Sequence, residues 1–311
     1  MDRIVALDFV LAEQVLFNLL DNAGRYADPG TEIVIDDAVQ LNGASGAIIT
    51  LDTTGGGTTL TGADVTITGG VSGIFSTRNA NNSLTVTAGT AGNVVLGSLR
   101  GFTNGGTGSV VSDLTVTGAN ISLPTIGTLG GFVVLGDADT VSVSVGGALT
   151  SGNASGIVMI ATDISLGGNL TAGASISLGG AVALTSSVVL TGDGISVLGT
   201  GTIAASGNDL TLDAQTGSTG AGLVSVSGAI SDAGRLTLVD STGATFNGAV
   251  TAQTLQITST NSGTVAFNND LTVAGTLSAA AGTYALSIVG GLNTIGGPVS
   301  FLNTGALTIG D

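Results

Sequence analysis

The chain has 311 residues, of which 53 are Gly, 8% are charged and 3% are aromatic, and its formal net charge is −16. It contains no His, Cys or Lys, which excludes Ser-His-Asp and Cys-His nucleophilic sites, the usual zinc sites and lysine Schiff bases. Five basic residues stand against 21 acids, which disfavours binding to nucleic acid or anionic lipid. No apolar run is long enough for a membrane-spanning helix, so membrane insertion is not expected.

The first 36 residues differ in composition from the rest, so we treat 1–36 and 37–311 as separate domains. The segment 1–36 holds both Glu residues of the chain but only two of its glycines. Apolar residues at helical spacing predict an amphipathic helix over 10–27, and residues 31–35 are predicted to form a strand. No signal peptide is visible, because the first residues lack a basic region, a clean apolar stretch and a cleavage site.

This first segment contains the sequence Glu13-Gln-Val-Leu-Phe-Asn-Leu-Leu-Asp-Asn-Ala-Gly-Arg-Tyr-Ala27, followed after Asp28 by Pro-Gly-Thr-Glu-Ile33. Over residues 7–36 it resembles the N-box of sensor histidine kinases, whose helix lines an ATP site. The resemblance implies that Asn18 and Asn22 would face Mg²⁺ and phosphate, that Arg25 would meet phosphate, and that Tyr26 would lie by the sugar or base.

Other features of the chain argue against an active kinase. There is no phosphoacceptor His, and Asp52-Thr-Thr-Gly-Gly-Gly57 departs from the Asp-x-Gly-x-Gly box of that family. We therefore interpret the segment as a vestigial fragment of an ATP site, with a solvated polar face, and we predict no cofactor.

Residues 37–311 repeat short strands that are punctuated by glycine. The stretch 163–186 contains Ile-Ser-Leu-Gly-Gly twice, at Ile164 and at Ile176, and each copy alternates apolar and polar residues before the glycine pair. Spacings of 19 residues (64 to 83 and 235 to 254) and 21 residues (285 to 306) indicate coils of about 20 residues with three strands each. Four-residue motifs of this form, called strand words below, begin at Asp64, Ser83, Asp113, Thr140, Asp209, Arg235, Thr254, Asp270, Ala285 and Ala306.

This pattern predicts an all-β fold, a right-handed parallel β-helix (β-solenoid), with a short N-terminal helix–strand appendage. Inward Val, Ile and Leu are buried only when coils stack, while Thr and Ser point outwards. Gly, Asn and Asp are expected at the corners between strands. The coil at 311 is expected to leave an unpaired edge, prone to end-to-end or edge self-association unless more chain follows.

Three phrases carry a second resemblance: Gly-Ala-Thr-Phe-Asn-Gly-Ala-Val (243–250), Gly-Thr-Val-Ala-Phe-Asn-Asn (263–269) and Gly-Asn-Asp-Leu-Thr-Leu (207–212). They are similar to the repeats of the filamentous haemagglutinin family of secreted bacterial adhesins. The resemblance implies a non-catalytic shaft at the cell surface or outside the cell. Its implied partners are an outer-membrane secretion transporter and receptors on host cells, on other bacteria or on glycans.

An enzyme is the alternative, because β-helix proteins also include polysaccharide-cleaving enzymes that use Asp carboxylates. Asp137 and Asp139 would share one face of an extended strand, as a general acid/base pair requires. Since no basic groups or Trp accompany them, we predict no catalytic residue.

Other acids and glycines are interpreted as structural. Asp209 and Asp213 lie beside a strand end and are expected at a corner. Clustered Asp side chains are suited to Ca²⁺, but the repeated nonapeptide of calcium β-rolls is missing, so no metal site is predicted. Gly55-Gly56-Gly57 imitates a phosphate loop without the following Lys, and we expect a turn there.

Overall fold

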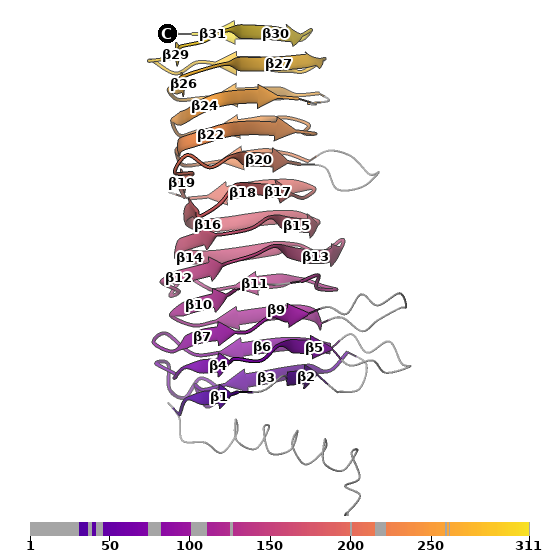
Figure 1. Ribbon diagram of the computed structural model, residues 1–311, viewed down its shortest axis with the longest axis vertical. Coiled ribbons are helices and arrows are strands. Elements are labelled where there is room, and N and C mark those ends of the chain that lie inside the picture. Colours follow the sequence, from indigo (N-terminus) through magenta and orange to yellow (C-terminus); the bar gives the residue numbers. More distant parts are fainter. Residues whose placement is uncertain are drawn as a thin grey trace, which may run out of the picture.

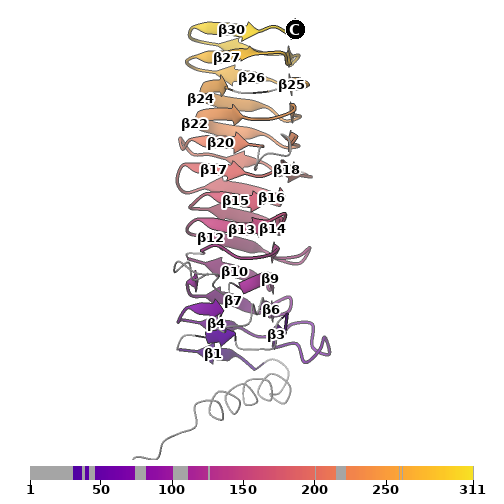
Figure 2. The same cartoon turned by 90° about the vertical axis from the view of Figure 1, so that its right-hand side faces the viewer.

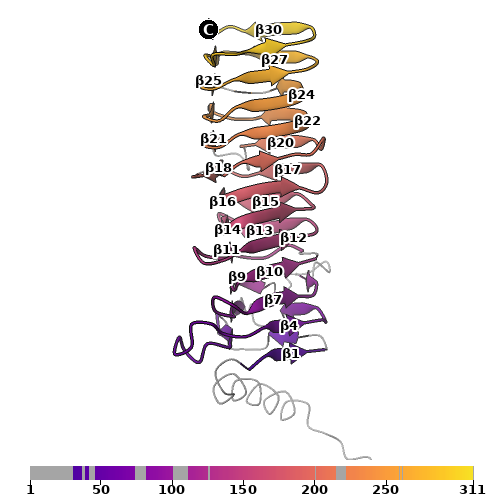
Figure 3. The ribbon, with the colours of Figure 1, turned by 90° about the vertical axis from the view of Figure 1, so that its left-hand side faces the viewer.

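The computed structural model describes residues 31–36, 39–41, 46–73, 82–100, 111–124, 127–199, 201–214, 222–258, 260 and 262–310. These residues form a long stack of parallel strands, and the chain climbs the stack from one end to the other (Figure 1). The two side views show the same narrow column (Figures 2 and 3). The predicted parallel β-helix is therefore confirmed.

The strands belong to three ladders, which the chain visits in a fixed order in every coil. Ladder 1 contains β1 (Ile33–Ile35), β4 (Val65–Ile67), β7 (Asn93–Leu96), β10 (Asn120–Leu123), β12 (Ser142–Val145), the second halves of β14 (Ile157–Leu166) and β16 (Ser175–Leu184), β19 (Ile203–Ala204), the first halves of β22 (Ile230–Val239) and β24 (Val250–Ile257), β26 (Leu271–Val273) and β29 (Thr294–Ile295).

Ladder 2 follows ladder 1 along the chain. It contains β2 (Val39–Leu41), β5 (Val71–Gly73), β8 (Leu99–Arg100), a bridge at Thr128, β13 (Leu149–Asn153), β15 (Leu170–Gly173), β17 (Val188–Thr191), β20 (Leu210–Asp213), the second halves of β22 and β24, β27 (Leu277–Gly282) and β30 (Val299–Asn303).

Ladder 3 completes each coil. It contains β3 (Ile48–Asp52), β6 (Asn82–Thr87), β9 (Val111–Thr117), β11 (Val133–Leu135), the first halves of β14 and β16, β18 (Gly194–Leu198), β21 (Val224–Val226), β23 (Ala244–Phe246), β25 (Thr264–Phe267), β28 (Ala285–Ile288) and β31 (Leu307–Ile309). Each ladder thus has one segment per coil, and the described residues make twelve coils, a shaft about 50 Å long at the usual strand spacing.

The core is a set of apolar columns that run along the inside of the ladders. Alternation puts every second residue of a strand inward, so β6 has buried and partly exposed residues in turn, and β16 alternates on either side of its bend at Gly179 and Gly180. One column of ladder 3 contains Phe246 and Phe267, whose rings stack with their centroids 4.8 Å apart and only 7° between their planes. Because a strand can bury its inward side chains only beneath the next coil, stacking is what closes the core.

The first strand of the solenoid lies in the segment predicted as an appendage. The strand predicted over 31–35 is confirmed as β1, and it pairs in parallel with β4 through Ile33 and Val65. The helix predicted over 10–27 lies outside the described residues. The chain therefore joins the stack at Ile33, before the boundary that composition suggested.

Two sequence spacings describe the coil correctly and one does not. Leu236 pairs with Leu255 and Leu286 with Leu307, as the spacings of 19 and 21 residues predicted. The spacing from 64 to 83 is wrong as a coil, because β4 lies in ladder 1 and β6 in ladder 3, and Val65 pairs with Val94. The same strand word serves all three ladders, since all three need the same inward alternation.

The twice-repeated word of 163–186 likewise falls on different ladders. Ile164 lies in ladder 1 and pairs with Val182, whereas Ile176 lies in ladder 3 and pairs with Ile157. The first glycine pair ends β14 after Leu166, as predicted. The second pair, Gly179 and Gly180, lies within β16, which bends around a corner without ending.

Candidate functional site

The acid pair Asp137 and Asp139 lies in a turn and not in a strand. The turn joins β11 to β12, and Gly136 enters it with a φ of +79°. One carboxylate oxygen of Asp137 accepts hydrogen bonds from the Asp139 backbone N–H (3.0 Å) and from Thr140 Oγ1 (3.1 Å). The stretch is therefore not extended, and the condition under which the two acids would share one face is not met, because the first acid closes the turn that carries the second.

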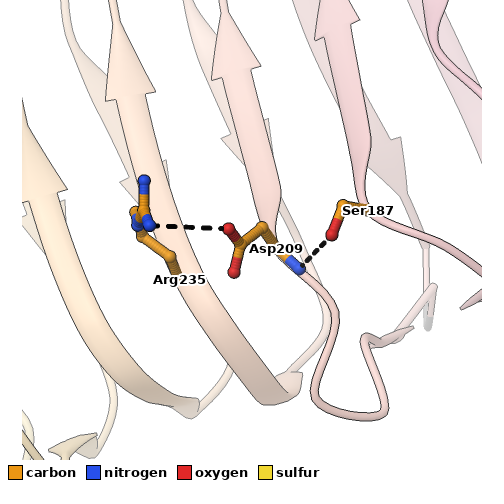
Figure 4. Close-up of polar contacts among 3 residues, drawn as sticks. All are labelled: Ser187, Asp209 and Arg235. Atoms are coloured by element: carbon orange, nitrogen blue, oxygen red, sulfur yellow. Dashed lines mark hydrogen bonds and ion pairs between the residues drawn. The ribbon is translucent and has the colours of Figure 1, made fainter.

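Asp209 lies at the start of β20 on an exposed stretch of ladder 2, between Ser187 and Arg235 of the neighbouring coils (Figure 4). Its carboxylate is 3.8 Å from the Arg235 guanidinium, and its backbone N–H donates to Ser187 Oγ at 3.1 Å. Both charged side chains are about half exposed, 45% for Asp209 and 53% for Arg235. Asp209 directly precedes β20 and Asp213 is its last residue, so both lie beside a strand end, as predicted. Asp213 is not at a corner, because it pairs with Thr191 and Val239 within ladder 2.

The glycine run 55–57 forms a turn in which the amide groups of Gly56 and Gly57 already have acceptors. Gly55, Gly56 and Gly57 have φ values of +61°, +71° and +84°. The Asp52 carboxylate accepts hydrogen bonds from the Gly56 N–H (2.8 Å) and from the backbone N–H and hydroxyl of Thr54 (2.7 and 2.6 Å). The carboxylate thus occupies the position that a phosphate would take in a phosphate-binding loop.

Those contacts also set the acidity of Asp52. Burial by itself raises the pKa of this carboxyl, but the hydrogen bonds from the Thr54 hydroxyl and from the amides of Thr54 and Gly56 outweigh burial. The pKa of Asp52 is therefore held below its ordinary value of 3.8, and the ionised form is the one that fits the turn.

Sequence reasoning missed the main use of the acids at strand starts, which is to bind the backbone of the next coil. Asp64 Oδ1 accepts from the Asn93 N–H at 2.7 Å, Asp113 Oδ1 from the Phe132 N–H at 2.8 Å, and Asp270 Oδ1 from the Leu292 N–H at 2.9 Å. Asp64 and Asp270 directly precede β4 and β26, and Asp113 lies within β9 where the register with β6 shifts. At such places the ladder hydrogen bonds are interrupted, and a short acceptor side chain replaces them. The signal was present in the sequence, since four of the strand words begin with Asp, and three of these, at Asp64, Asp113 and Asp270, make this contact.

Amide and hydroxyl side chains form similar links on the outer surface. Asn120 Nδ2 donates to Asn93 Oδ1 at 2.7 Å, and Ser142 Oγ donates to Asn120 Oδ1 at 2.7 Å, so three successive coils of ladder 1 are joined. In ladder 3, Asn268 Nδ2 donates to Asn247 Oδ1 at 2.9 Å. These polar groups are engaged in holding coils together.

The remaining site predictions have different outcomes. Asn18, Asn22, Arg25 and Tyr26 lie outside the described residues. Within the described ranges, no three acidic side chains come together as metal ligands. The same part of the chain has no helix with the length and apolar character needed to cross a membrane.

The chain was compared with family models, with curated proteins and with solved structures, and none of them matches it. The resemblances to adhesin repeats and to a kinase N-box therefore stay predictions from the sequence.

Proposed function

We propose that this chain is a non-catalytic shaft segment of a secreted or surface-displayed filamentous adhesin. The observation that carries the proposal is the continuous stack of twelve coils, whose inside is a set of apolar columns and whose outside is rich in Thr, Ser and Asn. Each added coil stabilises such a stack through contacts with its neighbour, so the stack can become long without a single central core.

The acids of the shaft support this proposal over catalysis. Asp52, Asp64, Asp113 and Asp270 each accept a backbone hydrogen bond that closes a turn or links two coils. Asp137 closes its own turn. An acid/base pair for glycoside cleavage needs two carboxyl groups that face one substrate across a fixed gap, and these side chains face the backbone.

The connections between strands support a presenting role. Three of the four longest connections, 74–81, 101–110 and 214–223, join ladder 2 to ladder 3, while most corners between ladders 1 and 2 take three residues. In repeat proteins, insertions of different length gather on one side of the stack, and that side often carries the binding residues. In a shaft built in this way, the connections vary in length and sequence from coil to coil while the core stays the same.

The direct test is binding of the purified chain to host cells, to bacteria and to a glycan panel. The matched control is the same chain with the order of residues scrambled inside the connections 74–81 and 101–110, which leaves every ladder intact. We expect binding that the control lacks. The circular dichroism of both proteins is measured first, because a control that has lost the folded signal would be invalid.

A second assay separates the shaft from the enzyme. The chain is incubated with a panel of acidic and neutral polysaccharides, and new reducing or unsaturated ends are measured. We expect none. Depolymerisation that disappears in Asp137→Asn or Asp139→Asn, with the fold intact, would overturn the proposal.

A further inference from the structure

The outer side of ladder 3 is a regular surface over eight successive coils in the middle of the shaft. From β11 to β28 the strands of this ladder lie one above another along one side of the column (Figure 3). They pair without a register shift inside the ladder, so their outward side chains form three straight columns. We define the ladder-3 face as the first, third and fifth residues of the segments 132–136, 156–160, 175–179, 194–198, 223–227, 243–247, 264–268 and 285–289.

The ladder-3 face carries no charge, because those eight segments contain no Asp, Glu, Lys or Arg. Over the same coils, ladder 1 contains Asp163 in β14, and ladder 2 contains Asp213 in β20 and Arg235 in β22. Acids such as Asp139 and Asp193 lie in the connections on either side of the face. In a chain with a net charge of −16, this is the side on which two copies repel each other least.

Four large apolar side chains are exposed at the edges of this face. Phe132 and Leu223, at the edge where the strands begin, are 53% and 63% exposed. Ile160 and Leu198, at the edge where the strands end, are 41% and 48% exposed. Single exposed apolar residues are normal, but four on one face within five coils form a patch of the kind that binds a partner.

Each of these large residues is matched by a small one at the other edge of the same strand, four residues away. The pairs are Phe132 and Gly136, Ile160 and Gly156, Leu198 and Gly194, and Leu223 and Ser227. A surface with this pattern is complementary to a copy of itself that has been turned half a revolution about the shaft axis, because that rotation exchanges the two edges.

From these observations we infer that the ladder-3 face binds the ladder-3 face of a second copy of this chain, with the two shafts side by side and pointing the same way. The contact is isologous, and its two-fold axis runs parallel to the shafts. Each exposed apolar side chain of one copy then lies against a Gly or Ser of the other. The middle columns face each other, so the Ser177 side chains of the two copies meet, as do those of Ser225. The inference goes beyond the proposed shaft function, because it names one face and one partner.

The other two-fold arrangement of the same faces fits less well. With the axis along β16 and the shafts opposed, Phe132 meets Leu223 and Ile160 meets Leu198, while Gly156 meets Gly194. Pairs of large side chains then hold the two sheets apart, and gaps are left between the glycines. Close packing therefore favours the arrangement in which the shafts point the same way.

The face is large enough for a specific dimer. Eight coils give a length of about 38 Å, and five residues give a width of about 16 Å. The two copies together thus bury about 1,200 Å², which is at the lower end of the range for specific interfaces. Flat sheets that stack face to face pack about 10 Å apart with their side chains interdigitated. An interface of this size predicts a dimer that dissociates on dilution.

The first experiment measures the mass of the full chain by sedimentation velocity over a series of concentrations, with the maximum dimension taken from small-angle scattering. We expect a monomer–dimer equilibrium in which the dimer is about as long as the monomer and has a larger cross-section, because the shafts lie side by side. A single monomeric species at all concentrations would overturn the inference. So would a dimer of about twice the monomer length, or an open series of larger oligomers.

Charge variants locate the contact. Ser177→Asp places two like charges face to face in the dimer and is expected to abolish it, as is Ser177→Lys. An equimolar mixture of the two variants is expected to restore the dimer, a result that a folding defect would not give. The control is Thr237→Asp, which adds the same charge on the outer side of ladder 2, where Thr237 is half-buried as Ser177 is. A dimer that survives both Ser177 variants, or one that Thr237→Asp abolishes, contradicts the inference.

Single cysteines test the orientation of the shafts, because the chain contains no Cys of its own. Residues 177 and 225 lie two coils apart in the middle column. A short bismaleimide is therefore expected to crosslink both Ser177→Cys and Ser225→Cys into dimers, and to leave the control Thr237→Cys monomeric. Opposed shafts bring only one position of the column face to face with itself. Crosslinking at one of the two positions alone would thus refute the parallel arrangement.

A glycan is the other partner that suits a flat face rich in Ser and Thr, and the same variants distinguish it. A chain that stays monomeric and loses binding to the glycan panel in Ser177→Asp, but not in Thr237→Asp, assigns the face to a glycan and overturns the inference. Because the readout of the dimer is the mass of the chain and not receptor binding, failure of the dimer leaves the shaft proposal standing.

Discussion

The middle of the shaft and the last described coil contain the same strand words, but only in the middle does a further coil cover them. Ala285-Leu-Ser-Ile288 and Ala306-Leu-Thr-Ile309 alternate in the same way and occupy adjacent places in ladder 3. Leu286 and Ile288 of the first word are buried, whereas Leu307 and Ile309 of the second are about half exposed. Burial in this fold is therefore a property of the neighbouring coil and not of the word itself.

Truncating equivalent residues in the two coils gives the largest expected difference. Leu286→Ala leaves a cavity between two coils and is expected to cost about 2–5 kcal/mol of unfolding free energy. Leu307→Ala removes a side chain that is half exposed and is expected to cost about 1 kcal/mol. The urea concentrations at the midpoint of unfolding are measured for both variants and compared with that of the parent chain. Equal losses would show that the last coil is covered.

A pair of glycines separates coil contact from backbone strain. Gly207 and Gly263 both have positive φ, +81° and +76°, but a Cβ at Gly207 meets no atom within 4 Å, while one at Gly263 would overlap the Thr242 carbonyl oxygen of the preceding coil. Gly207→Ala is expected to cost about 1 kcal/mol from backbone strain. Gly263→Ala is expected to cost about 1–3 kcal/mol more, because the coils must move apart.

Thermal melting of both glycine variants provides the comparison. A difference in the opposite direction, with Gly207→Ala the less stable protein, would show that spacing between coils is not what limits the substitution at Gly263.

The acids that link coils are expected to have a smaller effect. Asp113→Ala leaves the Phe132 N–H without its acceptor and is expected to lower the unfolding free energy by about 1 kcal/mol. Asp139→Ala, at an exposed acid of the turn after β11, removes the same charge and is expected to change it by less than about 0.5 kcal/mol. Urea titrations at neutral pH test the pair. Equal losses of unfolding free energy would show that the change in net charge, and not the lost contact with the Phe132 N–H, causes the effect.

The smallest expected effect depends on pH and concerns Asp52. Its pKa in the folded chain is lowered from 3.8, so its contribution to stability is present above the unfolded-state pKa and is lost as the pH falls through the folded-state value. Asp52→Asn replaces one of the two accepting oxygens with an amide donor, so one backbone N–H, of Thr54 or of Gly56, loses its acceptor. We expect the variant to unfold at lower urea near neutral pH and the difference to shrink below about pH 4. A difference that grows with acid would contradict the assignment.

The architecture could be predicted because it depends on features that a single coil contains. Alternation fixes which residues point inward, and glycine marks the corners, so the parallel β-helix followed from words such as Asp270-Leu-Thr-Val273. The pairing of coils was harder, because the three ladders use the same word. Nothing in the sequence distinguishes a spacing from Asp64 to Ser83, which crosses ladders, from one between Arg235 and Thr254, which stays within one.

The candidate site could be predicted less well for a related reason. An Asp two residues from another Asp reads as a pair on one strand face, but Gly136 with positive φ and Thr140 turn that stretch into a closed turn. The coil-to-coil role of Asp64 and Asp113 needs the corner of the next coil, which is 29 and 19 residues further along the chain. Such contacts are invisible to any local reading of the sequence.

The direction of the ladder hydrogen bonds decides how this column responds to force. They run along the axis of the column, from coil to coil, so a pull on the chain at the β31 end loads one coil at a time. Each coil that peels away frees its own length of chain, 21 residues between Leu286 and Leu307, which is about 70 Å when extended. Under tension the column therefore lengthens in steps several times larger than the spacing of its coils, and it dissipates work as it does so.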